Sequence, residues 1–240
     1  MATDNVGNII ETKSLYKVYT RGNASVNAVD NVDLTIKKGE FSALCGPSGS
    51  GKTTLLNLIS ALDSPSDGEV RFEGQPLSSL SRTQLSRLRR DRIGFVFQSF
   101  NLVPVLSAYE NVELVLSLQG VPSKARYDIV MPLLGSLGLE GLEHAKPAAL
   151  SGGQQQRVAV ARAIAHKPAI VMADEPTANL DSKSAGNLLD YMEKLNEEQN
   201  ITFLFSTHDQ KVMDRARRVI TLVDGKISDD VYQNADGQLQ

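Results

Sequence analysis

Features common in secreted and membrane proteins are missing from this sequence of 240 residues. It has one cysteine, Cys45, so no disulfide can form within the chain, which fits a reducing cytoplasm. No run of about 18 apolar residues occurs, so we expect no membrane-spanning helix, and any membrane role to need a partner. Residues 1–5 show no basic region followed by an apolar stretch, and we therefore expect no secretory signal.

A large excess of one charge is also missing. The net charge of −3 gives no sign of a surface for nucleic acid or anionic lipid. Hydrophobic residues (41%) and charged residues (22%) occur in the proportions of a globular protein, without internal repeats, heptad runs or low-complexity tracts. A chain of this length suits one large domain or two tightly joined lobes with a sizeable core.

A glycine-rich stretch fits the phosphate-binding pattern of Gly, four free residues and then Gly-Lys-Ser/Thr. Its residues are Gly46, Pro47, Ser48, Gly49, Ser50, Gly51, Lys52 and Thr53. The glycines allow positive φ, so that successive backbone N–H groups turn inward and form a nest for anionic oxygens. A plain glycine-rich turn is the alternative. Because an expected strand at 40–45 precedes the stretch and an expected helix beginning at Thr54 follows it, the phosphate loop is favoured.

The last two side chains of this loop have expected roles at a bound nucleotide. Lys52 reaches the β- and γ-phosphates. Thr53 supplies a hydroxyl to Mg²⁺, which takes few protein ligands alongside phosphates.

Two carboxylates, Asp174 and Glu175, follow the apolar run 169–173, which we expect to be a buried strand. Ligands bind at the carboxyl ends of strands in open α/β sheets, where the phosphate loop also lies. We therefore expect Asp174 to hold Mg²⁺ and Glu175 to act as general base on the attacking water. An ordinary exposed turn is the alternative, and the phosphate loop argues against it.

The residues Leu150, Ser151, Gly152, Gly153 and Gln154 place two glycines at the start of an expected helix. Free backbone N–H groups and a hydroxyl at a helix start can bind phosphate. Because the chain already has a nest at 46–53, a second binder of the γ-phosphate suggests that two copies pair head to tail, each completing the other's site.

Hydrophobic periodicity predicts strands at 9–19, 26–36, 69–73, 93–97, 169–173, 201–206 and 218–223. Helices are expected at 108–118, 125–137, 151–166, 184–199 and 209–216. The alternation in the second half indicates a mostly parallel sheet covered on both faces. A further, basic helix carries Arg82, Arg87, Arg89, Arg90 and Arg92, interpreted as a solvated face, with a phosphate- or acid-binding face as the alternative. The polar tail 229–240 is expected to be only partly ordered.

Seven motifs in one order make the chain resemble the nucleotide-binding subunit of the ABC (ATP-binding cassette) transporter family over about residues 9–227. They are Tyr19, the phosphate loop 46–53, Gln98, the residues 150–154, Asp174-Glu175, Asn179-Leu180-Asp181, and His208. Each of three single-residue motifs also has an ordinary interpretation when it is taken alone. Tyr19 could be a strand residue packed on its neighbours, Gln98 a polar residue at a strand end, and His208 a neighbour of a helix cap. Their shared order assigns them to a site.

The resemblance implies a role for each motif. Tyr19 stacks on adenine, and Gln98 acts at the metal and catalytic site while its loop senses the membrane partner. Residues 46–53 and Thr54 bind nucleotide. Ser151, Gly152, Gly153 and Gln154 form the family's signature motif and bind nucleotide as well. Asp174 and Glu175 form the Mg²⁺ and catalytic pair, Asp181 belongs to the loop that couples two sites, and His208 contacts the γ-phosphate.

The resemblance also implies a fold and an assembly. The fold is an α/β P-loop NTPase core with a mostly parallel sheet, an N-terminal antiparallel β-subdomain and an inserted helical subdomain. Residues 1–240 form one ABC ATPase domain, with a core lobe at about 1–100 and 161–240 and a helical lobe at about 101–160. The cofactors are ATP and Mg²⁺. The partners are a second copy, which supplies the signature motif in trans, and integral membrane permease-type subunits, with no nucleic acid. The implied location is cytoplasmic and peripheral, on the cytoplasmic face of the inner or plasma membrane.

Within the family, the stretches 92–104 and 109–114 look most like the branch that drives lipoprotein release, macrolide efflux and related envelope machines. Amino-acid importer cassettes are similar there, so an importer ATPase stays open as an alternative. A soluble ABC ATPase acting on nucleic acid or ribosomes is a second alternative, although the stretch between Lys52 and Ser151 is too short for a long coiled coil. A non-enzymatic nucleotide-gated adaptor would require a loss in the catalytic set, and none is seen. We expect the membrane partner to dock near residues 98–106.

Overall fold

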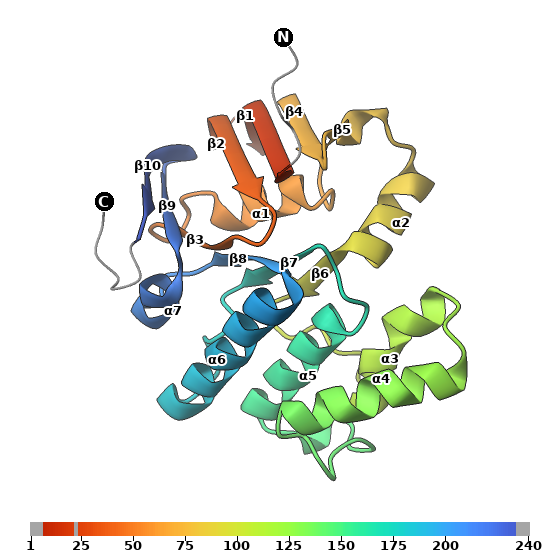
Figure 1. The fold of residues 1–240 in the computed structure, drawn as a ribbon. Coiled ribbons are helices and arrows are strands. Elements are labelled where there is room, and N and C mark those ends of the chain that lie inside the picture. The colour runs from red at the N-terminus through yellow and green to blue at the C-terminus, as the bar shows by residue number, and fades with distance from the viewer. Residues whose placement is uncertain (1–6, 22–23, 234–240) are drawn as a thin grey trace.

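The computed structural model describes residues 7–21 and 24–233, which form two β-sheets and the helices that cover them (Figure 1). The strands are β1 (Asn8–Arg21), β2 (Ala24–Lys37), β3 (Phe41–Cys45), β4 (Asp67–Phe72), β5 (Gln75–Pro76), β6 (Ile93–Val96), β7 (Ile170–Asp174), β8 (Thr202–Ser206), β9 (Arg218–Val223) and β10 (Lys226–Tyr232). The helices are α1 (Lys52–Ile59), α2 (Arg82–Arg92), α3 (Ala108–Leu118), α4 (Ser123–Ser136), α5 (Gly152–Ile164), α6 (Ser182–Gln199) and α7 (Gln210–Arg215), with 3₁₀ turns at Leu77–Ser79 and Pro147–Ala149.

The larger sheet has the strand order β10-β9-β3-β8-β7-β6. Its neighbours pair in parallel, except for the antiparallel pair β10 and β9. The smaller sheet has the order β2-β1-β4-β5, and all its pairs are antiparallel. A mostly parallel sheet joined to an antiparallel sheet of N-terminal strands confirms the predicted α/β fold class.

The central strands are buried on both faces, because alternate side chains point to opposite sides of a sheet. In β8, Phe203 and Phe205 belong to the core beneath the helices α3 to α7, whereas Leu204 belongs to the core around α1. All three side chains have 0% exposure. This two-sided burial explains why the strand reads as an unbroken apolar run.

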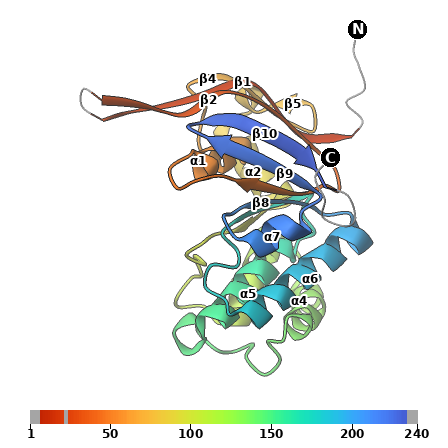
Figure 2. The same ribbon diagram turned by 90° about the vertical axis from the view of Figure 1, so that its left-hand side faces the viewer.

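Helix α1 lies between the two sheets (Figure 1). Its side chains Leu55, Leu58 and Ile59 share one core with residues of both sheets and are at most 1% exposed. The hairpin of β1 and β2 extends well beyond the rest of the smaller sheet (Figure 2). None of the helices in the described ranges is both long enough and apolar enough to span a bilayer.

Several boundaries differ from expectation by a few residues, and helix capping gives one reason. Helix α6 begins at Ser182 rather than 184, because the Asp181 carboxylate accepts hydrogen bonds from the N–H groups of Lys183 and Ser184 (both 3.0 Å). Helix α5 begins at Gly152, with Ser151 as its N-cap. Strand β7 includes Asp174, one residue past the expected end. The division into lobes at about 101 and 160 stays a prediction.

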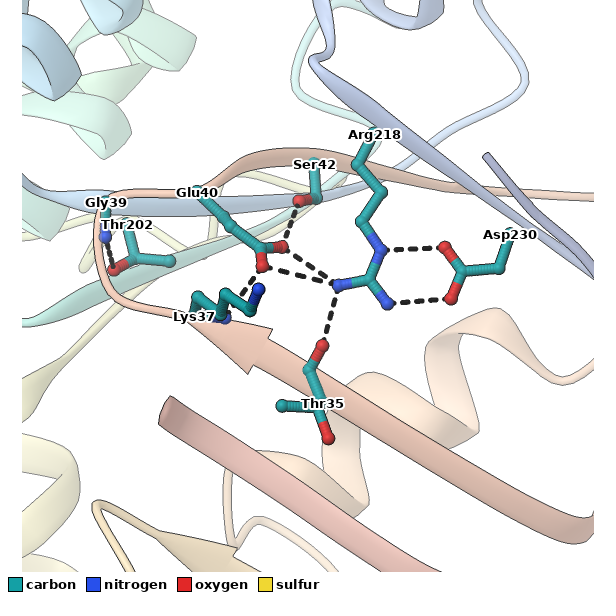
Figure 3. Close-up of polar contacts among 8 residues, drawn as sticks. All are labelled: Thr35, Lys37, Gly39, Glu40, Ser42, Thr202, Arg218 and Asp230. Carbon is teal, nitrogen blue, oxygen red and sulfur yellow. Dashed lines mark hydrogen bonds and ion pairs between the residues drawn. The ribbon is translucent and has the colours of Figure 1, made fainter. Parts of the chain in front are cut away.

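Of the tail from residue 229, which was expected to be only partly ordered, residues 229–232 belong to β10, and residues 234–240 lie outside the described ranges. Strand β10 is fixed by the Arg218 guanidinium, which donates two hydrogen bonds to Asp230 (both 2.7 Å), as Figure 3 shows. The same guanidinium donates to Glu40 (3.0 Å) and to the carbonyl of Thr35 in β2 (2.6 Å). It therefore ties β9 and β10 to the neighbouring smaller sheet.

Arg218 is held in its charged form although it is buried. Burial lowers its pKa, but the hydrogen bond with Asp230 and the charge of Glu40 outweigh this effect, and the pKa of Arg218 lies above its ordinary value. The side chains of Arg218 and Glu40 are only 7% and 11% exposed, so the Glu40 carboxylate depends on Arg218 for charge compensation.

We expect Arg218→Ala to lower the free energy of unfolding by about 3 kcal/mol, because it leaves the Glu40 carboxylate buried without a counterion. The measurement is urea unfolding. Arg215→Ala is the control: Arg215 pairs with Asp190 and Glu193, whose side chains are 62% and 32% exposed, so its loss should cost at most about 1 kcal/mol. Equal losses in the two variants would contradict the assigned role of Arg218.

Candidate functional site

The glycine-rich loop joins β3 to α1 through backbone conformations that suit glycine. Gly46 and Gly51 have φ values of +142° and +102°. A Cβ atom on Gly46 would meet the carbonyl oxygen of Leu222 at 2.0 Å, and one on Gly51 would meet that of Ala28 at the same distance. Both glycines are therefore required by packing as well as by φ, and they set the path of the loop.

Helix α1 begins at the end of this loop, so its free N–H groups and positive dipole end face the space above the loop. Lys52 Nζ donates to the carbonyls of Gly46 (2.7 Å) and Pro47 (3.0 Å). The ammonium group thus lies over the loop, in the region where the nest would receive a phosphate.

The carboxyl ends of β7 and β8 bring oxygen atoms to the same region. Asp174 pairs with Ser206 in the sheet register, and the Ser206 hydroxyl donates to Asp174 Oδ1 (2.7 Å). The other oxygen, Oδ2, accepts from the Thr53 hydroxyl (3.1 Å). A carboxylate and a hydroxyl held side by side are hard oxygen donors of the kind that Mg²⁺ prefers, so these residues fit a magnesium ion.

Glu175 follows β7 in a left-handed conformation with φ of +49°. Its N–H donates to the Ser206 carbonyl (2.8 Å), which anchors the turn to β8. One carboxylate oxygen accepts from the Thr207 hydroxyl (3.2 Å), and the other lies 2.6 Å from His208 Nδ1. The Glu175 side chain is 12% exposed and that of His208 is 77% exposed. Glu175 therefore lies in the wall of the site, and His208 lies at its opening.

A pocket of about 570 Å³ lies over the loop, within the size range of ligand sites. It is lined by Val26, Ala28, residues 46–54, Gln98, Asp174, Glu175, Ser206 and His208. Most of the predicted site residues are therefore gathered at one pocket. Sequence reasoning missed Val26, Ala28 and Ser206. For Ser206, its place at the carboxyl end of an apolar strand was an available signal.

Gln98 follows β6, and its loop is anchored to another predicted motif. The Asn179 side chain donates from Nδ2 to the carbonyl of Gln98 (3.1 Å). The Gln98 loop and the loop of Asn179 and Asp181 are thereby connected within one chain.

The motif at the start of α5 does not line this pocket. Ser151 and Gln154 form a capping box: the Ser151 hydroxyl accepts from the Gln154 N–H (3.2 Å), and Gln154 Oε1 accepts from the Ser151 N–H (2.8 Å). The Ser151 hydroxyl keeps its own hydrogen for donation elsewhere. Asp181 is likewise outside the pocket and caps α6, and hydrogen bonds from Ser184 lower its pKa.

Tyr19 also lies outside the residues that line the pocket. It pairs directly with Val26 across the hairpin, and paired residues share a face, so the Tyr19 ring is on the face of a pocket-lining residue. Its hydroxyl donates to Asp63 (3.0 Å), and the ammonium of Lys17 lies 5.1 Å from the ring centroid. Tyr19 is 44% exposed, which leaves part of the ring open to a ligand.

Comparison with known proteins places this geometry in a family. The family model described as "ABC transporter" matches residues 29–178. The chain is 40% identical over 234 residues to the ABC transporter ATP-binding protein YxdL of Bacillus subtilis, covering 98% of this chain and 91% of that protein. It is 47% identical over 222 residues to the macrolide export ATP-binding/permease protein MacB of Hyphomonas neptunium, covering 92% of this chain and 34% of that protein.

A solved structure agrees over nearly the whole chain. The ATP-binding cassette MJ0796 of Methanocaldococcus jannaschii, described as the dimeric structure of a post-hydrolysis state bound to ADP and Pi, superposes with a TM-score of 0.89. The two chains are 43% identical, and the match covers 93% of this chain and 98% of that one. The chain therefore belongs to the ABC transporter family, as one of its ATP-binding, ATP-hydrolysing cassettes.

Proposed function

We propose that this ATPase subunit works as a head-to-tail pair that closes around two MgATP molecules and drives a membrane subunit. The observation that carries the proposal is the separation of the two phosphate-binding motifs. The loop 46–53 lines the pocket with Asp174 and Glu175, whereas Ser151 to Gln154 do not line it. A second copy can supply that motif, and the dimeric state described for MJ0796 supports such an arrangement.

Phosphate binding follows from groups that the fold holds in advance. The loop N–H groups and the α1 dipole receive the β- and γ-phosphates, and Lys52 exchanges its two carbonyl partners for phosphate oxygens. Thr53 and Asp174 hold Mg²⁺, with Gln98 at the same edge of the pocket. When bound, Mg²⁺ neutralises the charge that develops on the transferred phosphoryl group.

Glu175 is the general base in this proposal. It is fixed by Thr207 and His208, and it borders the same pocket as Lys52. A carboxylate in this position accepts a proton from the attacking water while the preorganised cations stabilise the phosphoryl charge. His208, being largely exposed, is placed to contact both Glu175 and the γ-phosphate.

The membrane role rests on the relatives. The macrolide export proteins carry an ATP-binding part and a permease part in their names, and this chain matches 34% of the length of one of them. We therefore propose that this cassette drives a membrane permease, that the complex serves efflux or envelope release, and that the cassette sits on the cytoplasmic face of the membrane. An importer ATPase remains the alternative of the same family, and no nucleic acid is expected as a partner because the net charge is −3.

Glu175→Gln should bind ATP with unchanged affinity and lose at least about 100-fold in kcat, because the amide cannot accept the proton from water. The measurement combines nucleotide binding with steady-state phosphate release. Glu198→Gln, an exposed change on α6, is the control and should match the wild type. Turnover at the wild-type rate in Glu175→Gln would show that Glu175 is not the general base.

Head-to-tail pairing is tested by mixing two inactive variants. Lys52→Ala removes the phosphate lysine, and Gly152→Asp places a negative charge at the start of α5, where a Cβ meets no atom closer than 3.8 Å. A mixed dimer has one fully intact site only if the two motifs act in trans. We expect partial recovery of ATPase activity on mixing. Activity no higher than the sum of the two variants would contradict the arrangement.

The membrane partner is tested by purification of the tagged Glu175→Gln chain from native membranes with MgATP in mild detergent. We expect a stoichiometric polytopic membrane protein, because the chain that closes on ATP and does not hydrolyse it keeps its complex. Lys52→Ala with the same tag is the control and should retain less of that partner. Retention of ribosomal proteins or nucleic acid instead would contradict the membrane role.

A further inference from the structure

The loop after Gln98 is held by Arg162, which lies in the last part of α5. Arg162 Nη1 donates to the carbonyl of Asn101 (2.5 Å), and Nη2 donates to the carbonyl of Phe100 (2.8 Å). The partners are 61 and 62 residues away in sequence, so these contacts join two parts of the chain that meet only in the folded protein. They lie two and three residues beyond Gln98.

The charge of Arg162 has no carboxylate partner within the described ranges. Arg162 is half-buried, which lowers its pKa, and the guanidinium stays charged at physiological pH. Its two hydrogen bonds to protein groups within the described ranges both go to backbone carbonyls, those of Phe100 and Asn101. Such an arrangement indicates that the position of these carbonyls matters.

The loop itself adopts a conformation that its residues disfavour. Phe100 and Asn101 have φ values of +59° and +49°, in the left-handed region. Asparagine tolerates this region, but for a bulky residue such as phenylalanine it is a true outlier. Within the loop, the Phe100 N–H donates to the Phe97 carbonyl (3.1 Å) and the Asn101 N–H to the Ser99 carbonyl (2.6 Å). Conformations of this kind persist where the surroundings fix them, and the Arg162 fork supplies that restraint.

We infer that Arg162 is a positioning residue for Gln98, acting through the carbonyls of Phe100 and Asn101. The inference rests on the proposed function, because Gln98 matters only if the pocket over the loop 46–53 hydrolyses ATP. Arg162 shares a rigid helix of 13 residues with Gly152 at its start. Displacement of the start of α5 is therefore transmitted to the Gln98 loop, and a pull on that loop is transmitted back to α5.

The shape of the side chain matters for this role. The guanidinium presents N–H donors in a planar fork, and two of them reach two carbonyls at once. The ammonium of lysine is a single compact point with freely rotating donors, so it cannot restrain both carbonyls in the same way. Arg162→Lys keeps the charge and removes the fork, which makes it the informative variant even if Arg162→Ala fails to fold.

The first measurement is hydrogen exchange of the free protein, which needs no turnover. We expect the amides of Phe100 and Asn101 to exchange at least tenfold faster in Arg162→Lys, with exchange in α5 and the central strands unchanged. Arg89→Lys is the matched control, because Arg89 also donates to a backbone carbonyl, that of Ala61 (2.6 Å), and this carbonyl is not part of the Gln98 loop. It should leave the loop amides unchanged.

The second measurement separates binding from turnover. We expect Arg162→Lys to lower kcat about tenfold while ATP affinity changes less than twofold, and Arg89→Lys to change neither. Unchanged exchange of the loop amides, faster exchange throughout the molecule, or faster loop exchange with an unchanged kcat would each overturn the inference. If the wild type itself hydrolyses no ATP, the proposed function fails, and the exchange data still report whether Arg162 restrains the loop.

Discussion

The parallel register of β3, β8 and β7 is the constraint on which the site depends. Leu44 in β3 and Asp174 in β7 both pair with Ser206 in β8, so three strands end at the same level. The loop 46–53 follows the first strand and His208 follows the second, while the third strand ends in Asp174, with Glu175 directly after it. Because each strand is buried on both faces, a slip of this register would exchange the residues of the two cores, and burial therefore fixes the site.

The backbone conformation just after each strand then fixes where the residues of the site lie. Gly46 and Gly51 pass so close to the carbonyls of Leu222 and Ala28 that no side chain fits, and the loop is pressed against its neighbours. Glu175 takes a left-handed conformation and is fixed through the Ser206 carbonyl. The site is thus preorganised by packing, which suits a reaction that needs positioning and charge stabilisation more than covalent chemistry.

Two guanidinium groups link parts of the chain that are distant in sequence, in different ways. Arg218 is balanced by the carboxylates of Glu40 and Asp230 and joins the two sheets, so its contribution is to the fold. Among the described residues, Arg162 donates hydrogen bonds to the carbonyls of Phe100 and Asn101 and thereby restrains a loop at the pocket. Arg218 is thus a buried, paired charge that stabilises the fold, whereas Arg162 is a half-buried charge that we infer to position a loop.

The sequence by itself determined the α/β class, the phosphate loop and the order of the motifs, because glycine spacing and apolar runs are local properties of the chain. Helix starts were less certain, since capping by Asp181 or Ser151 depends on hydrogen bonds that periodicity does not encode. Only the tertiary structure decided which motifs meet at one pocket and which stay apart. It also decided that β10 is ordered and that Arg162 faces the Gln98 loop, because such contacts join residues far apart in the chain, where no sequence period reaches.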